Sequence, residues 1–157
     1  MSQYTIDRLG QHDRRLFDCG SSDLNRYLRE RVSQDIRRRV TSCFVALDRV
    51  GMIAGFYTMA ATSLAVDQLP AEEAKRLPRY PIVPAVLLGR LAVSLAHQGK
   101  GLGEALVVDA MQRSTQSEVM IHAMVVDAID QRAAKFYRNL AFEPSCDNPL
   151  RLFRKLR

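Results

Sequence analysis

The chain has 157 residues, which suits one domain that buries roughly two-thirds of its unfolded surface. Hydrophobic residues make up 47% of it and charged residues 25%, which excludes intrinsic disorder as the default. The net charge of +6 favours a polyanionic partner or an anionic cofactor, although charge alone does not establish nucleic-acid binding.

A membrane segment and a metal site are both disfavoured. The uncharged run from Val50 to Val66 is shorter than the ~20 residues of a membrane span and contains Gly, Thr and Ser. The N-terminus has no basic-then-apolar leader, so we expect a cytoplasmic protein. We expect free thiols and no metal, because no Cys-x-x-Cys pair or metal-ligand spacing involves the cysteines, which are Cys19, Cys43 and Cys146.

The first part of the chain predicts a strand, a helix and a β-hairpin. Ser21, Ser22 and Asp23 supply N-cap residues for a helix of about four turns. Its apolar stripe recurs every four residues, at Leu24, Leu28, Val32 and Ile36. Strands are expected on either side of this helix, at 4–9, 42–47 and 52–61, with a turn at 48–51.

The rest of the chain predicts alternating helices and strands. Pro70, at the first helical position, and the acids after it open a short helix at 69–73. The other expected elements are strands at 86–93, 119–126 and 151–156, and helices from 102 and at 130–139. The helix from 102 is expected to bury Leu102, Ala105, Leu106 and Ala110. The order β-α-β-β-α-β-α-β-α-β predicts one α/β (α+β) domain over 1–157, a mixed sheet covered by helices.

A glycine-rich turn at 98–103 joins the strand ending at Val93 to the next helix. Its glycines leave backbone N–H groups free of Cβ atoms, and the positive end of the helix dipole faces the same place. This pattern predicts a pyrophosphate cradle, with a plain strand-to-helix turn as the alternative. It differs in spacing from both the P-loop and the dinucleotide fingerprint.

Two motifs resemble the GCN5-related N-acetyltransferase (GNAT) family. The Leu-Ala-Val strand followed by Gln-x-x-Gly-x-Gly resembles that family's acetyl-CoA motif. The segment 133–142 resembles its Ala-x-x-Phe-Tyr-x-x-x-Gly-Phe motif, except that Ala141 replaces the glycine. The resemblance implies a GNAT fold, with a mostly antiparallel central sheet and about four flanking helices, and acetyl-CoA as cosubstrate.

Four further segments are similar to the acetyltransferase toxins of type II toxin–antitoxin pairs: 17–28, 56–59, 77–84 and 88–93. Members of this subfamily acetylate the α-amine of the amino acid on charged tRNA and thereby block translation. The resemblance also implies a ribbon-helix-helix antitoxin that forms a repressor complex with the toxin, contact with DNA through that complex, and a homodimer.

The resemblance assigns roles to residues of this chain. Tyr137 is expected to protonate the leaving thiolate, since a phenol with a pKa near ~10 stays protonated at neutral pH. The strand that pairs with the pantetheine arm is expected to be Leu91, Ala92 and Val93. The cradle is expected to comprise Gln98, Gly99, Lys100, Gly101, Leu102 and Gly103. Phe136 is a further expected cofactor contact, with apolar cover of the sheet as its alternative, and Lys100 is alternatively a surface lysine.

No general base stands out. Asp130 and Glu104 are better explained as a helix cap and a surface acid, and His97 and His122 as structural residues. An α-amine with a pKa of roughly 7.7–8.0 is substantially neutral at physiological pH, so the lack of a base mildly favours such a substrate.

A basic helix face is the candidate tRNA surface. Its expected phosphate contacts are Arg26, Arg29 and Arg37. Arg90, beside the cofactor strand, is a further expected contact, with phosphate at the acceptor end of the tRNA. The alternative is a solvated face with cations at a helix C-terminus. Two other functions stay open: acetylation of a small amine or protein N-terminus, and a non-catalytic RNA- or protein-binding module on the same scaffold.

Overall fold

The computed structural model describes residues 3–77 and 80–156. Pro78 and Arg79, which belong to the segment 77–84 of the toxin resemblance, lie outside the described residues. The chain divides into two compact units. Unit 1 comprises Met1–Ala60 and Gly89–Ala110, and unit 2 comprises Ala61–Leu88 and Met111–Arg157.

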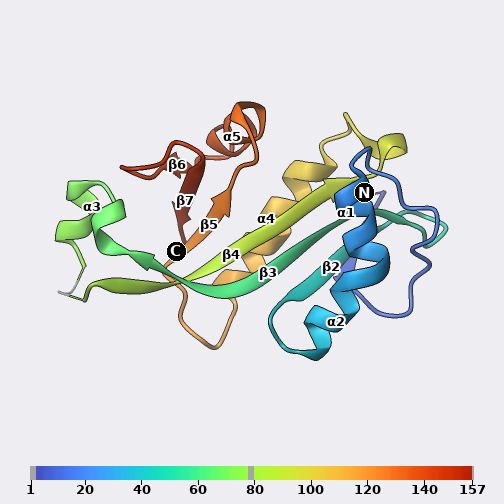
Figure 1. Ribbon diagram of the computed structural model, residues 1–157, viewed down its shortest axis with the longest axis horizontal. Helices are drawn as coiled ribbons and strands as arrows, with labels where there is room; N and C mark the ends of the chain where they lie inside the picture. The colour runs from blue at the N-terminus through green and yellow to red at the C-terminus, as the bar shows by residue number, and fades with distance from the viewer. Residues whose placement is uncertain (1–2, 78–79, 157) are drawn as a thin grey trace. The chain divides into compact units, whose positions relative to one another are not determined.

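The described residues form a mixed β-sheet and accompanying helices (Figure 1). The strands are β1 Thr5–Arg8, β2 Ser42–Leu47, β3 Ile53–Ala65, β4 Ile82–Val93, β5 Ala123–Asp127, β6 Glu143–Pro144 and β7 Arg151–Lys155. The α-helices are α1 Ser22–Arg26, α2 Val32–Arg37, α3 Ala71–Lys75, α4 Leu102–Thr115 and α5 Gln131–Arg138. A π turn and two 3-10 turns complete the set: η1 Tyr27–Arg31, η2 Val66–Gln68 and η3 Leu95–His97.

The strand order is β1-β2-β3-β4-β5-β7-β6. β5 is parallel to β4, whereas the β1–β2, β2–β3, β5–β7 and β6–β7 pairs are antiparallel. The mixed sheet with helices that the sequence predicted is therefore confirmed. Among the described residues, no helix has both the length and the apolarity that a membrane crossing requires.

The helix predicted after Ser21 is present but is not a regular α-helix. The Ser21 hydroxyl accepts a hydrogen bond from Leu24 N at 3.3 Å, as an N-cap does. α1 then widens into the π turn η1 before α2 continues to Arg37. The sequence prediction of one uniform helix missed this turn, and π turns often accompany functional sites.

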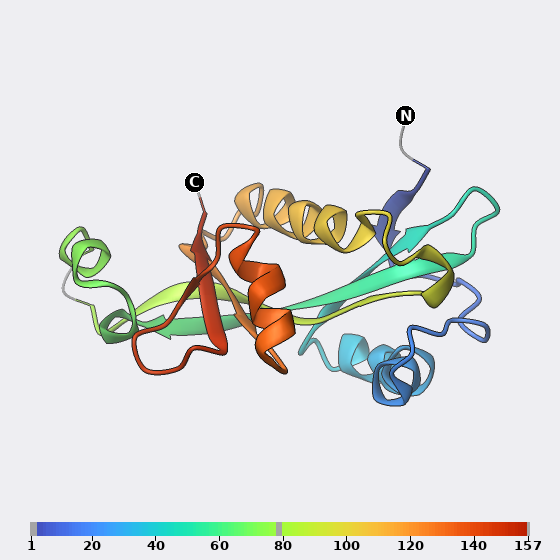
Figure 2. The ribbon, with the colours of Figure 1, turned by 90° about the horizontal axis from the view of Figure 1, so that it is seen from above.

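In unit 1, helices cover both faces of the strands. Figure 2 shows α1 and α2 on one side of β2 and β3 and the first part of α4 on the other. The face toward α1 and α2 buries Phe17, Tyr27, Leu28, Val32, Val45 and Phe56. On the other face the Tyr57 hydroxyl donates a hydrogen bond to the Asp109 carboxylate of α4 at 2.6 Å.

The buried side of α4 differs from the expectation at one position. Leu102, Leu106 and Ala110 are buried as predicted, but Ala105 is exposed and Val107 is buried in its place. The spacing of apolar residues defines a stripe about 100° wide, and residues at its margin cannot be assigned to one side without the partner surface.

β4 and α4 both approach β3 closely at Gly55. A Cβ added to it would be 3.0 Å from Ala92 O and 3.1 Å from Leu106 Cδ1. Because one of these atoms belongs to the backbone, a larger residue would displace the strand or the helix. The absence of a side chain at Gly55 therefore allows α4 to pack directly on the strands.

The hydrophobic core of unit 2 surrounds β5. It buries Leu64, Leu69, Val83, Ala85, Ala123, Val125 and Phe153. Three predictions need correction here. β5 begins at Ala123 rather than near 119, because Val119 and Met120 are exposed. Pro70 is the N-cap of α3 rather than its first helical residue, and β6, with two residues, was not foreseen.

α5 ends in a Schellman motif that contains the substituted residue of the family pattern. Ala141 N donates to Arg138 O and Phe142 N donates to Tyr137 O, which satisfies the last carbonyls of the helix. Ala141 has a φ of 69°, the left-handed conformation that glycine adopts without a Cβ penalty. The turn after α5 is thus kept despite the alanine, at a local cost in energy.

We predict that Gly55→Ala lowers the free energy of unfolding by about 1–3 kcal/mol, because the new methyl group overlaps Ala92 O and Leu106. Urea denaturation measures the change. Gly10→Ala is the matched control, since its Cβ would meet the His12 ring at an ordinary 3.7 Å. Equal stability of the two variants would contradict the packing argument.

We predict that Ala141→Gly raises the free energy of unfolding by about 0.5–1 kcal/mol, because it removes the left-handed alanine. Ala133→Gly, within α5 and at an ordinary helical position, should lower it by about the same amount. Thermal denaturation of both variants checks the opposite signs, and a stability loss in Ala141→Gly would refute the prediction.

Candidate functional site

The glycine loop between η3 and α4 has an open backbone. Gly99 and Gly101 have φ values of 77° and 80°, which favour glycine over other residues. A Cβ added to either would meet no atom within 4 Å, so the space in front of the loop is unfilled. α4 begins at Leu102, and Ala105 N donates to Gly101 O in its first turn. The loop therefore presents unhindered backbone at a helix N-terminus, as an anion site requires.

The segment that leads into the loop is held by backbone hydrogen bonds to distant parts of unit 1. Ser94 N donates to Ala54 O at 2.8 Å, and Leu95 N donates to Asp18 O at 2.8 Å. Both bonds lie within six residues of the first loop glycine. The loop therefore starts from a fixed position rather than from a free end.

Gln98 has a role that the sequence motif did not indicate. Its side-chain Nε2 donates to Val93 O at 3.0 Å and to Cys19 O at 3.2 Å. The amide hydrogens are thus used on two carbonyl groups, and the side chain braces the loop. Any contribution of Gln98 to an anion comes through its main-chain N–H.

The strand expected to carry the pantetheine arm is the last part of β4. Ala92 is buried, whereas Leu91 and Val93 are half-buried. Lys100 is exposed and lines a hollow of about 360 Å³ together with Gln3, Tyr4, Gly101, Leu102 and Ala105. Ala92 O and the Leu102 side chain both lie beside Gly55 of β3, so the end of β4 and the helix start after the glycine loop are close together.

Arg90 is stacked on an aromatic ring of η1. Its guanidinium carbon lies 3.6 Å from the centroid of the Tyr27 ring, within cation–π range. The Tyr27 hydroxyl donates to Asp35 Oδ2 at 2.8 Å. Burial, more than the bond to Asp35, raises the pKa of Tyr27 above its ordinary value. Arg90 is therefore oriented by the π turn, a relation that no local pattern in the sequence indicated.

The three helical arginines differ in their surroundings. Arg26 forms an exposed ion pair with Glu30 at 3.8 Å, a contact of little energetic weight. Arg29 donates to the main-chain oxygens of Phe17 and Arg14 and so also holds the preceding loop. Arg37 is exposed at the end of α2. Of the three, Arg29 has a structural task that the sequence analysis missed.

Tyr137 is a buried phenol in α5. The helix is capped by Asp130, whose Oδ1 accepts from Ala133 N at 2.8 Å, as predicted. Tyr137 is 9% exposed and contacts Phe136 and Phe142 edge-on, with ring centroids 5.1 Å and 5.5 Å away. Burial raises the pKa of Tyr137 to about 12, so the phenol keeps its proton at neutral pH. Phe136 is half-buried and forms part of this aromatic group.

Both histidines considered in the sequence analysis have structural contacts. His97 is hydrogen-bonded to Tyr4, and His122 Nε2 lies 3.6 Å from Glu73 Oε1. Burial lowers the pKa of His122 below its ordinary value, although the nearby Glu73 carboxylate acts in the opposite direction. The same Glu73 oxygen lies 3.3 Å from Lys155 Nζ.

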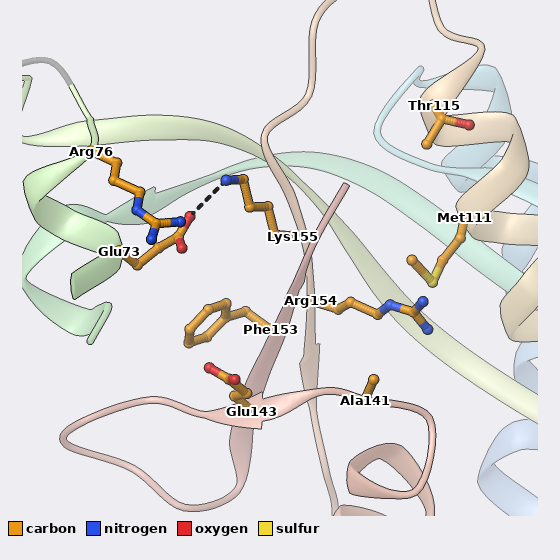
Figure 3. Close-up of a pocket in the computed structure, with 9 residues that line it drawn as sticks. All are labelled: Glu73, Arg76, Met111, Thr115, Ala141, Glu143, Phe153, Arg154 and Lys155. Carbon is orange, nitrogen blue, oxygen red and sulfur yellow. Dashed lines mark ion pairs between the residues drawn. The ribbon is translucent and has the colours of Figure 1, made fainter. Parts of the chain in front are cut away.

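Unit 2 also contains a hollow of about 550 Å³ beside this ion pair. Figure 3 shows Glu73 and Lys155 pointing toward each other, while Arg154 extends toward Met111 and Thr115 of α4. In the part of the chain that the structure describes, none of the residues assigned from the sequence lines this hollow. Among residues 3–77 and 80–156, no group of three His, Cys, Asp or Glu side chains could hold a metal ion.

Comparisons with known proteins agree with this geometry. Residues 39–144 match the family described as the acetyltransferase (GNAT) domain. A relative from Mycobacterium tuberculosis, named tRNA-acetylating toxin, is 36% identical over 138 residues, which are 87% of this chain and 81% of the relative.

Solved structures give the same result. A structure of AtaT complexed with acetyl-methionyl-tRNAfMet has a TM-score of 0.91 and 30% identity, covering 97% of this chain and 94% of that chain. A tyrosine-to-phenylalanine variant of AtaT, bound to the C-terminus of the antitoxin AtaR and acetyl-CoA, has a TM-score of 0.82 and 26% identity, covering 98% and 94%. This chain belongs to the GNAT family of acetyltransferases.

Proposed function

We propose that this acetyltransferase is the toxin of a type II toxin–antitoxin pair. It transfers the acetyl group of acetyl-CoA to the α-amine of the amino acid on charged tRNA and so blocks translation. The observation that carries the proposal is the 36% identity to a tRNA-acetylating toxin over 87% of this chain. The likeness to AtaT complexed with acetyl-methionyl-tRNAfMet supports the same substrate class.

The glycine loop fits the diphosphate of acetyl-CoA. Gly99 and Gly101 leave space where Cβ atoms would stand, and α4 begins directly after them. In this proposal the backbone of 98–103 binds the pyrophosphate, Lys100 adds a positive charge, and Leu91–Val93 pairs with the pantetheine arm. An N–H of that strand supports the thioester oxygen as charge develops on it. Phe136 is the further cofactor contact.

Direct attack by the amine needs orientation of the two reactants and a proton donor for the departing sulfur. Tyr137 is the proposed donor. Since its pKa is about 12, it donates a hydrogen bond to the developing thiolate and passes it a proton only late, as the carbon–sulfur bond breaks. The amine nitrogen loses one proton to solvent as the amide forms, and the phenolate regains one. The attacking α-amine, with a pKa of roughly 7.7–8.0, is substantially neutral without a protein base.

The proposal extends to partners and location. We infer a ribbon-helix-helix antitoxin, DNA contact through the toxin–antitoxin complex, a homodimer and a cytoplasmic location. A bound antitoxin in an AtaT structure supports the first of these. We also infer one GNAT domain over 1–157, because β3, β4 and α4 each contribute residues to both units.

The experiment that tests the function incubates the protein with labelled acetyl-CoA and total charged tRNA. Acetylated aminoacyl-tRNA is the expected product. Acetylation of free amines or protein N-termini, with charged tRNA untouched, would favour the rival acetyltransferase. Absence of any labelled product would favour a non-catalytic binding module.

We predict that Tyr137→Phe lowers the rate of charged-tRNA acetylation by roughly 100-fold or more, because the proton donor is lost. Binding of acetyl-CoA, measured by calorimetry, should change little, since the variant removes one oxygen. Tyr80→Phe, at an exposed tyrosine, is the matched control and should keep the wild-type rate. A wild-type rate in Tyr137→Phe would remove Tyr137 from this role.

We predict that Arg37→Glu raises the KM for charged tRNA roughly tenfold, because a phosphate contact is lost. The slope of log tRNA affinity against log salt concentration should become shallower by ~1. The KM for acetyl-CoA should stay unchanged. Arg15→Glu makes the same charge change at an exposed site near the start of the chain and serves as the control. An equal effect of both variants would indicate net charge rather than a specific surface.

A further inference from the structure

His97, the residue before the Gln98 brace, is held at both ring nitrogens. Nδ1 is hydrogen-bonded to the Tyr4 hydroxyl at 2.7 Å, and the two rings meet edge to face with centroids 5.4 Å apart. Nε2 lies 3.8 Å from Asp48 Oδ2. The carboxylate can only accept, so it favours a proton on Nε2 and leaves Nδ1 to accept from Tyr4. One imidazole thus joins two segments that are distant in the sequence.

Both partners are themselves fixed in position. Asp48 closes the β2–β3 turn, where its Oδ1 accepts from Val50 N at 3.0 Å and from Met52 N at 2.9 Å. Tyr4 directly precedes β1, which pairs with β2. His97 therefore connects the end of η3 to the hairpin turn and to the start of the first strand.

The contact lies outside the apolar core of unit 1. The side chains of His97 and Asp48 are 21% and 23% exposed and border a surface hollow of about 270 Å³ with Tyr4. Tyr4 also lines the hollow beside Lys100 and Gly101. The polar cluster of Tyr4, His97 and Asp48 thus lies next to the glycine loop rather than under the helices that form the core.

We propose that His97 is a positioning residue for acetyl-CoA, acting through the backbone of the glycine loop. This inference rests on the proposed role of that loop. Together with the Gln98 brace, the His97 contacts fix the chain up to Gly99, so that the open N–H groups need little further ordering when the diphosphate binds. Ordering a loop on binding costs affinity, and a loop already in its bound conformation avoids that cost.

The test measures acetyl-CoA affinity and kinetics of the full chain. His97→Ala should raise the Kd and the KM for acetyl-CoA roughly three- to tenfold, the effect of about one hydrogen bond. The kcat and the KM for charged tRNA should stay unchanged, as should the melting temperature within a few degrees. A merely structural role would lower stability and kcat together, and that result would overturn the proposal.

Two conservative variants resolve the cluster. Tyr4→Phe removes only the hydroxyl, and His97→Asn keeps a polar atom near the position of Nδ1 and should restore part of the affinity lost in His97→Ala. The double variant Tyr4→Phe/His97→Ala should bind no more weakly than His97→Ala, because both changes remove the same contact. Additive losses of acetyl-CoA affinity would overturn the proposal. If His97→Ala does not fold, the acetyl-CoA affinity of Tyr4→Phe decides the proposal instead.

Further variants distinguish this inference from the function on which it rests. His12→Ala is the matched control, since its Nδ1 accepts only a local bond from Gly10 N at 3.1 Å. Gly101→Ala should weaken acetyl-CoA binding, because it strains the left-handed loop backbone. Weak binding by Gly101→Ala with normal binding by His97→Ala overturns the inference and leaves the loop function standing. Normal binding by Gly101→Ala overturns both.

Discussion

The close approach of β3, β4 and α4 at Gly55 is the contact on which the candidate site of unit 1 depends. The missing Cβ lets Ala92 O of β4 and the Leu102 and Leu106 side chains of α4 converge on one point of β3. The strand proposed for the pantetheine arm and the helix proposed for the pyrophosphate are thus positioned against the same backbone. The glycine loop joins β4 to α4, and both of these elements are fixed by the contact at Gly55.

The loop itself combines a fixed approach with an open tip. Backbone bonds from Ser94 and Leu95, and the two side-chain bonds of Gln98, hold the residues before Gly99. At Gly99 and at Gly101 no atom lies within 4 Å of the position that a Cβ atom would take. Such a division suits an anion site, because binding energy is then not consumed in ordering the backbone. In unit 2, burial raises the pKa of Tyr137 and so keeps the phenol protonated at neutral pH.

The sequence was sufficient where the signal is local. The glycine spacing at 99–103, the start of α4 at Leu102 and the Asp130 cap were all predictable, because each depends on neighbours within one helical turn. The side-chain role of Gln98 was not, since its partner Cys19 lies 79 residues away. The contacts of two arginines were also not predictable from local sequence. Arg90 stacks on the Tyr27 ring, and Arg29 donates a hydrogen bond to Phe17 O. The two residues of β6 are too few to give a periodic pattern.

The π turn explains why apolar residues spaced four apart lie on one face of the first helix, from Leu24 to Ile36. In a regular α-helix with 3.6 residues per turn, each such step drifts by about 40°, so Ile36 would be rotated about 120° from Leu24. The wider turn at Tyr27–Arg31 winds back part of this drift, and Leu24 and Ile36 both pack on the cluster that buries Leu28 and Val32. The azimuth of Arg37 relative to the first turn is set in the same way. Loss of a single residue within η1 would convert the wide turn into a regular α turn, so the basic end of the helix would keep its azimuth relative to the first turn.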